Sequence, residues 1–212
     1  MALALGVLIS GRGSNLLAIL EAIQQGTLDA TVKVVVCNKA KAAGLELAKE
    51  RGIQTAFLDP KPFAQEDNPR EAYDLAVGRV LQEYGVVCVA LAGYMRIVTP
   101  ALIRMFPSKM LNIHPSLLPA FPGLDAQRQA LEWGAKVSGC SVHFVTEGVD
   151  EGPIICQKAV AINEEDTVET LSARILEQEH QLYPQALQLM SQGRLQVEGR
   201  RVRVLQDKGI RS

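Results

Sequence analysis

The sequence has little of what marks membrane-spanning, exported or nucleic-acid-binding proteins. Lysine and arginine number 22 against 23 acidic residues, so the formal net charge is -1 and no basic excess favours a nucleic-acid partner. No apolar run approaches the ~20 residues that are needed to cross a bilayer. The start of the chain lacks both a charged leader and a small-residue cleavage site, and it has the pattern of a buried first strand. We therefore expect a cytoplasmic protein that binds neither membranes nor nucleic acids.

Cysteine is also scarce, and its four copies are widely spaced. Cys37, Cys88, Cys140 and Cys156 include no pair with the C-x-x-C spacing of zinc sites or thioredoxin-type redox sites. Each follows a small or apolar residue, which favours buried positions on strands and suits a reducing cytosol. The sequence therefore predicts no metal site.

The length and the order of the apolar segments predict one α/β domain. The 212 residues are 48% hydrophobic and 21% charged, which is typical of a globular chain. In the first half, short apolar runs alternate with helical spacing of leucine, isoleucine and alanine, a pattern that predicts a parallel sheet with helices on both faces. We expect strands at residues 4–10, 31–37, 54–57 and 86–92, and helices at residues 15–25, 42–51 and 69–84, the last of them capped by Asn68.

The second half is predicted to extend the same sheet. After a short helix that starts at Thr99 and Pro100, we expect a strand at residues 110–114, a proline- and glycine-rich loop, a helix at 126–133, strands at 137–145 and 154–160, a helix at 167–193 that kinks or breaks at Pro184, and a hairpin at 195–205. The fold class is thus a Rossmann-like, mostly parallel twisted sheet with helices on both faces. It would form a single domain, residues 1–212, whose halves meet near residue 107.

The first candidate site is the loop Ser-Gly-Arg-Gly-Ser-Asn at residues 10–15, between the first strand and the first helix. Ligands of open parallel sheets bind at the carboxyl ends of the strands, and a glycine-rich turn into a helix offers backbone N–H groups to an anion. Leu16 stands where a dinucleotide motif has its third glycine, and no acid follows the second strand for a ribose. A single phosphate group therefore fits better than a dinucleotide. The alternative is a tight turn with a helix cap.

The second candidate site is the pair Asn112 and His114. They stand two residues apart at the end of a predicted strand, so their side chains point to the same face. A carboxamide beside an imidazole can stabilise a developing oxyanion and transfer protons. Pro115 stiffens the turn that follows. The alternative is a structural histidine near a turn, and the residues alone leave both interpretations open.

A third candidate, Asp150, lies in the loop Glu-Gly-Val-Asp-Glu-Gly-Pro at residues 147–153. A carboxylate there can orient an imidazole and stabilise its charged form, although a solvated, turn-forming aspartate is the commoner case. No nucleophile stands out, since Ser14 and Ser116 lack a G-x-S-x-G setting. Direct transfer between two bound substrates is therefore favoured over covalent catalysis.

Three motifs together resemble those of the folate-dependent formyltransferases. They are S-G-R-G-S-N at residues 10–15, N-I-H-P-S-L-L-P-A-F-P-G at 112–123 and S-V-H-F-V-T-E-G-V-D-E-G-P at 141–153. The similarity runs along nearly the whole chain and is greatest to members that act on glycinamide ribonucleotide. It implies the formyltransferase fold and the transfer of a formyl group from 10-formyltetrahydrofolate to the amine of that ribonucleotide, a step of purine biosynthesis. The folate would be a co-substrate, with no cofactor tightly bound, and the chain a monomer or a homodimer.

The resemblance also assigns roles to matching residues. Asn112, His114 and Asp150 match the family's catalytic trio. The first loop would hold the phosphate of the ribonucleotide, and an acid would hold its ribose. The loop residues here are Gly13, Ser14 and Asn15, and the acid is Glu179. The folate would lie against the segments that here supply Arg70, Met95, Arg96, Ile97, Val98, Asn112, Thr146, Glu147, Gly148, Val149 and Asp150. Arg12 stands at a variable position of the family, where a second cation near a phosphate fits, and residues 124–127 receive no role.

Three alternatives remain. Methionyl-tRNA formyltransferase shares the N-x-H-P-S-L-L-P core but adds a C-terminal tRNA domain, for which we expect no room after Leu205, and the near-neutral charge opposes a tRNA partner. Formyltetrahydrofolate hydrolase carries an N-terminal regulatory domain, whereas here the first strand is expected within a few residues of Met1. A module that only binds a nucleoside monophosphate would leave Asn112 and His114 unexplained.

Overall fold

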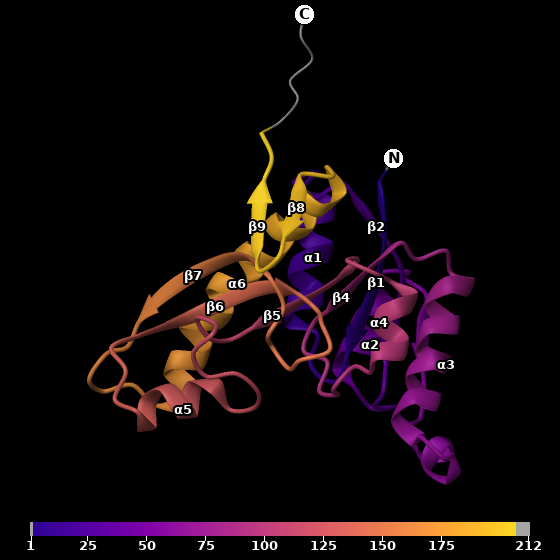
Figure 1. The fold of residues 1–212 in the computed structure, drawn as a ribbon, viewed down its shortest axis with the longest axis horizontal. Coiled ribbons are helices and arrows are strands. Elements are labelled where there is room, and N and C mark those ends of the chain that lie inside the picture. The colour runs from indigo at the N-terminus through magenta and orange to yellow at the C-terminus, as the bar shows by residue number, and fades with distance from the viewer. Residues whose placement is uncertain (1, 207–212) are drawn as a thin grey trace, which may run out of the picture.

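The computed structural model describes residues 2–206, in which nine strands form one sheet (Figure 1) of order β3-β2-β1-β4-β5-β6-β7-β9-β8. The strands are β1 (Leu3–Ile9), β2 (Ala30–Cys37), β3 (Thr55–Phe57), β4 (Cys88–Leu91), β5 (Met110–His114), β6 (Val137–Phe144), β7 (Ile154–Ala161), β8 (Leu195–Glu198) and β9 (Arg201–Val204). The helices are α1 (Ser14–Gln24), α2 (Ala43–Glu50), α3 (Pro69–Glu83), α4 (Pro100–Met105), α5 (Ala126–Glu132) and α6 (Val168–Ser191), with a short 3-10 helix η1 (Lys61–Gln65) that was not predicted. Every predicted element is present, with ends that differ from expectation by two residues at most.

The first five strands pair in parallel and are covered on both faces. β1 pairs with β2 and β4, β2 with β3, and β4 with β5. Successive side chains of a strand point to opposite faces. Val7 of β1 therefore joins a hydrophobic cluster with residues of α1, α2 and α6, whereas Leu8 joins a second cluster with residues of α3 and α4. Figure 1 shows α3 and α4 next to each other on their side of the sheet. This arrangement confirms the predicted α/β fold class.

The sheet becomes antiparallel in the second half of the chain. β5 pairs antiparallel with β6, and β6 pairs antiparallel with β7. The predicted hairpin forms as β8 and β9, and a parallel bridge between Ile154 and Arg201 attaches it to β7. α6 packs on β6 and β7 and also contacts α1 in the first half. One sheet therefore spans both halves, as expected from the sequence.

Of the kink or break predicted at Pro184, the break is wrong, because α6 is one continuous helix. Proline removes one backbone hydrogen bond from a helix, but Pro184 lies on the buried face of α6 and its neighbour Tyr183 is fully buried. The Tyr183 hydroxyl donates to the carbonyl oxygens of Leu91 (3.0 Å) and Leu111 (2.9 Å), which belong to β4 and β5. Packing against the sheet and these hydrogen bonds hold the helix together across the proline.

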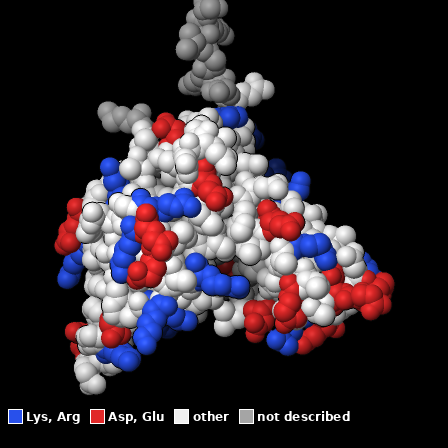
Figure 2. Space-filling model, turned by 180° about the vertical axis from the view of Figure 1, so that it is seen from behind, with Lys and Arg blue, Asp and Glu red and all other residues white. Residues whose placement is uncertain are grey.

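Charged side chains of both signs are interspersed over one face of the molecule (Figure 2). On the face shown in Figure 2, lysines and arginines lie among aspartates and glutamates, without one continuous band of a single sign. Positive and negative charges on this face are therefore not separated into large areas of opposite sign. None of the helices within residues 2–206 combines the length and the apolar composition of a membrane span.

The loop after β1 lies against the start of α2. Gly13 has a φ of +80°, and a Cβ at this position would stand 2.8 Å from the Cα of Gly44. The Gly44 N–H donates to the carbonyl oxygen of Gly11 (3.1 Å). Two glycines thus allow α1 and α2 to begin side by side at the predicted phosphate loop.

Replacing Gly13 by alanine should lower the free energy of unfolding more than replacing Gly26 by alanine. Both glycines have a left-handed φ, +80° and +73°, which should cost an alanine ~1–2 kcal/mol. Nothing lies within 4 Å of a Cβ added at Gly26, whereas overpacking against Gly44 should add ~1–3 kcal/mol at Gly13. Urea unfolding of the two variants measures the difference. Equal losses would show that the loop moves aside to admit the methyl group.

Candidate active site

β5 and β6 bring the three predicted catalytic residues together. Asn112 and His114 lie on β5 at the carboxyl end of the parallel strands, and Asp150 lies in the turn between β6 and β7. The turn folds back over β5. Oδ2 of Asp150 is 3.3 Å from Nδ1 of His114, and Oδ1 accepts a hydrogen bond from Nδ2 of Asn112 at 3.4 Å. The predicted approach of Asp150 to His114 is therefore present in the structure.

The backbone around Asp150 fixes the position of its carboxylate. Asp150 has a φ of +55°, in the left-handed region, and its Oδ2 accepts the N–H of Gly123 at 2.8 Å. Gly152 lets the turn close, because a Cβ there would lie 1.7 Å from a backbone carbonyl oxygen of β6. Burial acts to raise the pKa of Asp150, but the hydrogen bond from the Gly123 N–H and the charge of His114 act in the opposite direction, and the pKa stays below its ordinary value. Asp150 is therefore a carboxylate at neutral pH.

Both ring nitrogens of His114 face hydrogen-bond acceptors. Nε2 lies 2.8 Å from the carbonyl oxygen of Phe121, and Nδ1 faces the Asp150 carboxylate. A neutral imidazole has a single N–H and would turn a lone pair toward one of these acceptors. The geometry therefore fits a doubly protonated ring. His114 is 5% exposed, so water screens its attraction to the carboxylate only weakly.

His143 of β6 belongs to the same cluster and was not predicted. In the antiparallel register it pairs with Asn112, and its Nε2 lies 3.2 Å from Asn112 Nδ2 and 3.4 Å from Asp150 Oδ1. The signal that could have found it is the Ser-x-His alternation of β6 opposite the Asn-x-His of β5, since paired residues of antiparallel strands share a face. Within residues 2–206, no three His, Cys, Asp or Glu side chains are arranged to hold a metal ion.

The loop after His114 is fastened to the sheet by two further side chains. Ser141 Oγ donates to the carbonyl oxygen of Ser116 (2.6 Å) and accepts the N–H of Leu118 (3.0 Å). Gln157 Nε2 donates to Ser141 Oγ (2.8 Å) and to the carbonyl oxygen of Leu118 (2.9 Å). The loop that carries the acceptor for His114 Nε2 is thus held in one position relative to β6 and β7.

A serine joins the loops that follow three neighbouring parallel strands. Ser10 Oγ donates to Asn38 Oδ1 (2.6 Å) and accepts the N–H of Met95 (2.8 Å), so the ends of β1, β2 and β4 meet. Gly13 and Ser14 lead from this junction into α1, whose first turn contains no acidic residue. A helix N-terminus of this kind favours an anion.

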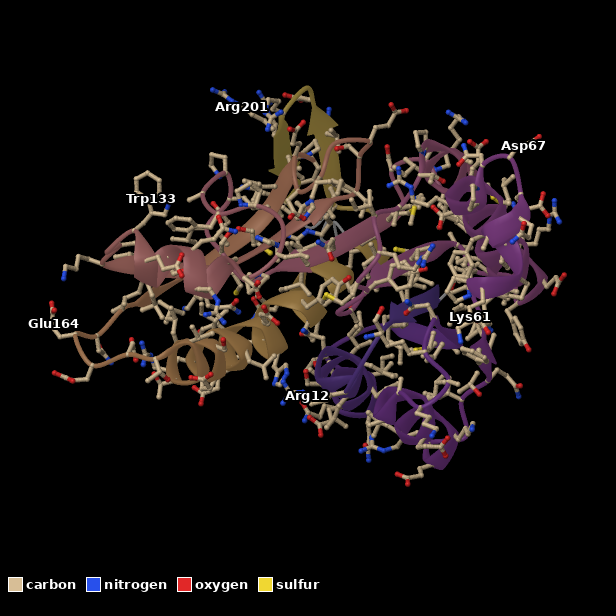
Figure 3. All side chains as sticks on the ribbon, turned by 90° about the horizontal axis from the view of Figure 1, so that it is seen from below. Arg12, Lys61, Asp67, Trp133, Glu164 and Arg201 are labelled. Atoms are coloured by element: carbon tan, nitrogen blue, oxygen red, sulfur yellow. The ribbon has the colours of Figure 1, made fainter. Side chains whose placement is uncertain are left out.

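Two of the predicted ribonucleotide residues lie in direct contact. Asn15 Nδ2 of α1 donates to Glu179 Oε2 of α6 at 2.8 Å, although 164 positions separate the two residues. Both side chains are buried, and burial raises the pKa of Glu179 to about 7, while the hydrogen bond from Asn15 acts in the opposite direction. The exposed Arg12 side chain lies next to α1 and α6 in Figure 3. The first loop, α1 and α6 therefore come together at the start of α1.

Most of the predicted folate residues lie on two loops at the same edge. After β4, Met95 and Ile97 are 61% and 56% exposed, while Val98 is buried. The Arg96 guanidinium lies 4.3 Å above the ring of Tyr73. Between β6 and β7, Thr146, Glu147 and Val149 are exposed and Gly148 is half-buried. Exposed apolar side chains on both loops offer a surface to a flat ligand.

Arg70 stands apart from this cluster. It is exposed in the first turn of α3, and no hydrogen bond or ion pair within residues 2–206 joins it to the trio. Its charge acts on Asp74, whose pKa is raised by burial and which accepts the N–H of Thr99 at 2.6 Å. Arg70 therefore flanks the segment after β4 and does not take part in the catalytic cluster.

Comparison with known proteins identifies close relatives over nearly the full chain. A family model described as formyl transferase matches residues 4–187. The phosphoribosylglycinamide formyltransferase of Escherichia coli (strain K12) is 44% identical over 191 residues, which covers 90% of this chain and 88% of that protein. The solved structure of glycinamide ribonucleotide transformylase 1 from Symbiobacterium toebii matches with a TM-score of 0.93 and 54% identity, over 97% of this chain and 95% of that chain.

The chain is also similar to one part of larger proteins. It is 47% identical over 191 residues to the trifunctional purine biosynthetic protein adenosine-3 of Gallus gallus, which covers 90% of this chain and 19% of that protein. The chain thus spans about a fifth of the length of these trifunctional relatives.

Replacing Glu179 by glutamine should make the free energy of unfolding less dependent on pH. With a folded pKa of about 7 against an ordinary 4.5, Glu179 keeps its proton in the native state where the unfolded chain has released it. Wild-type stability should therefore fall as pH rises through this interval, by up to about 3 kcal/mol. Urea unfolding at pH values near 5 and 8 measures the slope. Glu177→Gln, an exposed position on the same helix, is the matched control and should keep the wild-type slope. An unchanged slope in Glu179→Gln would assign the titration to another group.

Proposed function

The chain belongs to the formyl transferase family, and from this membership and the site geometry we propose that it is an enzyme that transfers a formyl group from 10-formyltetrahydrofolate to the amine of 5'-phosphoribosylglycinamide. The products are formylglycinamide ribonucleotide and tetrahydrofolate, and the reaction is a step of de novo purine biosynthesis. The folate is a co-substrate and not a tightly bound cofactor. The observation that carries the proposal is the cluster of Asn112, His114 and Asp150 beside a loop that fits a single phosphate.

The reaction needs no nucleophilic side chain. The amine nitrogen bonds to the formyl carbon, and the carbonyl electron pair moves to oxygen. An N–H of Asn112 and the imidazolium of His114 stabilise the oxyanion. The amine nitrogen then loses a proton, the bond from the carbon to N10 of the folate breaks, and N10 takes up a proton as it leaves. Asp150 keeps His114 charged and oriented while these protons move.

The ribonucleotide would extend from the first loop toward the trio. Its phosphate would bind where Gly13 and Ser14 open α1, and the exposed Arg12 would add a cation nearby. Asn15 holds Glu179 at 2.8 Å, which supports a role for this carboxyl group as an acceptor for the ribose hydroxyls. The amine end of the ribonucleotide would then reach Asn112 and His114.

The folate would occupy the surface formed by the loop after β4 and the turn that carries Asp150. Met95, Ile97 and Val149 are exposed there and would contact its rings. Arg70 would supply positive charge to its carboxylates from the start of α3. The other folate residues of this proposal are Arg96, Val98, Asn112, Thr146, Glu147 and Gly148.

The proposal includes the organisation and the location of the enzyme. Residues 1–212 would form a single domain with halves that meet near residue 107, and the single sheet through both halves supports this. The protein would act in the cytoplasm as a monomer or a homodimer, without a nucleic-acid or membrane partner. The four cysteines are free thiols, which supports a reducing compartment.

An assay with both substrates tests the function. Purified protein is mixed with 10-formyl-dideazafolate, with and without the ribonucleotide, and the folate chromophore is followed. We expect a change that requires the ribonucleotide. A change without it would identify a hydrolase, in which water replaces the amine. No change under either condition, with the ribonucleotide still bound, would leave only a binding module.

Replacing His114 by alanine should lower kcat by ~10²–10⁴-fold, the usual contribution of a positioned acid–base group. Asn112→Ala should lower it by ~10²–10³-fold, as for the removal of one oxyanion donor. Steady-state kinetics measures both effects, and thermal unfolding checks that each variant is folded. Full activity in either variant would remove that residue from the catalytic trio.

Replacing Ser14 by aspartate should weaken ribonucleotide binding while folate-analogue binding barely changes. The new carboxylate would occupy the N-terminus of α1, where the phosphate is expected, and two anions would compete for one site. Ser14→Ala removes the hydroxyl without adding charge and is the matched control. Calorimetric titration of each ligand measures the two affinities. Equal loss of both ligands in Ser14→Asp would show that the loop has only a structural role.

A further inference from the structure

His143 is a buried histidine whose ring is held at both nitrogens. It is 2% exposed, so its polar atoms depend on protein partners. Nδ1 lies 2.9 Å from the backbone carbonyl oxygen of Phe144. A carbonyl oxygen can only accept, so the proton is on Nδ1. In a neutral ring, Nε2 is then an acceptor.

That acceptor faces the carboxamide of Asn112. Nδ2 of Asn112 lies 3.2 Å from His143 Nε2 and 3.4 Å from Asp150 Oδ1. Two acceptors therefore surround the nitrogen end of the amide. If the amide were rotated by half a turn, its oxygen would face a lone pair and a carboxylate. His143 in this form permits only one orientation of Asn112.

Charge balance favours the neutral form of His143. The geometry of His114 fits an imidazolium, and Asp150 supplies one negative charge to balance it. A second imidazolium at His143 would share the single carboxylate of Asp150, whose Oδ1 lies 3.4 Å from Nε2, and one buried positive charge would remain in excess, which is costly. It would also direct an N–H at the Asn112 nitrogen, 3.2 Å away.

We propose that His143 is a positioning residue for the formyl transfer: its Nε2 accepts one N–H of Asn112 and thereby presents the other N–H to the oxyanion. The inference rests on the proposed function. The other N–H contacts only Asp150 Oδ1 within residues 2–206, and 3.4 Å is long for a hydrogen bond. It is therefore available to a stronger acceptor. An amide held the other way would turn Oδ1 toward the oxyanion and repel it.

The pair His143→Gln and His143→Asn tests which ring nitrogen matters. Glutamine can place an amide oxygen near the position of Nε2, whereas asparagine reaches only the position of Nδ1. His143→Asn should lower kcat by ~10²-fold, approaching the loss of one oxyanion donor, with KM nearly unchanged. His143→Gln should keep most of kcat. Equal kcat values in the two variants would overturn the proposal.

A double-mutant cycle separates positioning from a general structural effect. In the Asn112→Ala background, His143→Asn should cause almost no further loss of kcat, because the group it positions is gone. Losses that multiply would show that His143 acts through Asp150 or through the fold, and would contradict the inference. Val142→Ala is the matched control, since Val142 is fully buried next to His143 and points to the opposite face of β6. It should lower stability and leave kcat unchanged.

Nitrogen NMR of the wild-type protein tests the inference without an activity measurement. The chain has only 3 histidines, so ¹⁵N-histidine labelling gives three ring signals, and the His143→Asn variant assigns one of them. We expect a neutral ring protonated at Nδ1 for His143. A ring protonated at Nε2, or at both nitrogens, would overturn the proposal. If the wild type shows this tautomer but transfers no formyl group, the proposed function fails while the orientation of Asn112 stands.

Discussion

The antiparallel register between β5 and β6 is the constraint on which the site depends. It pairs Asn112 with His143 and His114 with Ser141, so all four side chains lie on one face of the sheet. Because side chains alternate along a strand, a slip of one residue would turn His143 and Ser141 to the face opposite Asn112 and His114. The turn that follows β6 carries Asp150 back toward β5. The same pairing thus supplies the trio, the histidine next to it and the serine that fastens the loop after His114.

A single carboxylate then organises the polar atoms that the register brings together. Asp150 contacts the side chains of Asn112, His114 and His143 and the N–H of Gly123. Its left-handed φ is unusual for a residue other than glycine, and strained backbone of this kind is maintained where the surrounding structure fixes it. His114 has an acceptor at each ring nitrogen, a geometry that fits one imidazolium beside this one negative charge and would leave the cluster close to neutral. This balance explains how so many polar atoms are tolerated at a mostly buried site.

The fold was largely predictable from the sequence, because hydrophobic periodicity and cap residues are local signals. The break predicted at Pro184 was wrong because the opposing effect, the burial of Tyr183 against β4 and β5, comes from distant parts of the chain. The trio came from motifs, and its contacts agree with them. His143 was missed although it lies inside a quoted motif, since its role depends on which residue pairs with it across the sheet. The contact between Asn15 and Glu179 is equally long-range, and no local pattern predicts it.

α6 contacts both the start of α1 and the strands next to Asn112 and His114. The parallel half of the sheet provides a helix N-terminus suited to an anion, and the pairing of β5 with β6 provides the groups that are proposed to transfer protons. Glu179 of α6 bonds to Asn15 at the first of these. One helical turn further along, the Tyr183 hydroxyl donates hydrogen bonds to the carbonyl oxygens of Leu91 and Leu111. Leu111 directly precedes Asn112 on β5. Since both anchors lie on one continuous helix, the distance between the phosphate loop and the trio is set by rigid elements. In the proposed reaction, a substrate that reached both ends would therefore be selected for its length as well as for its charge.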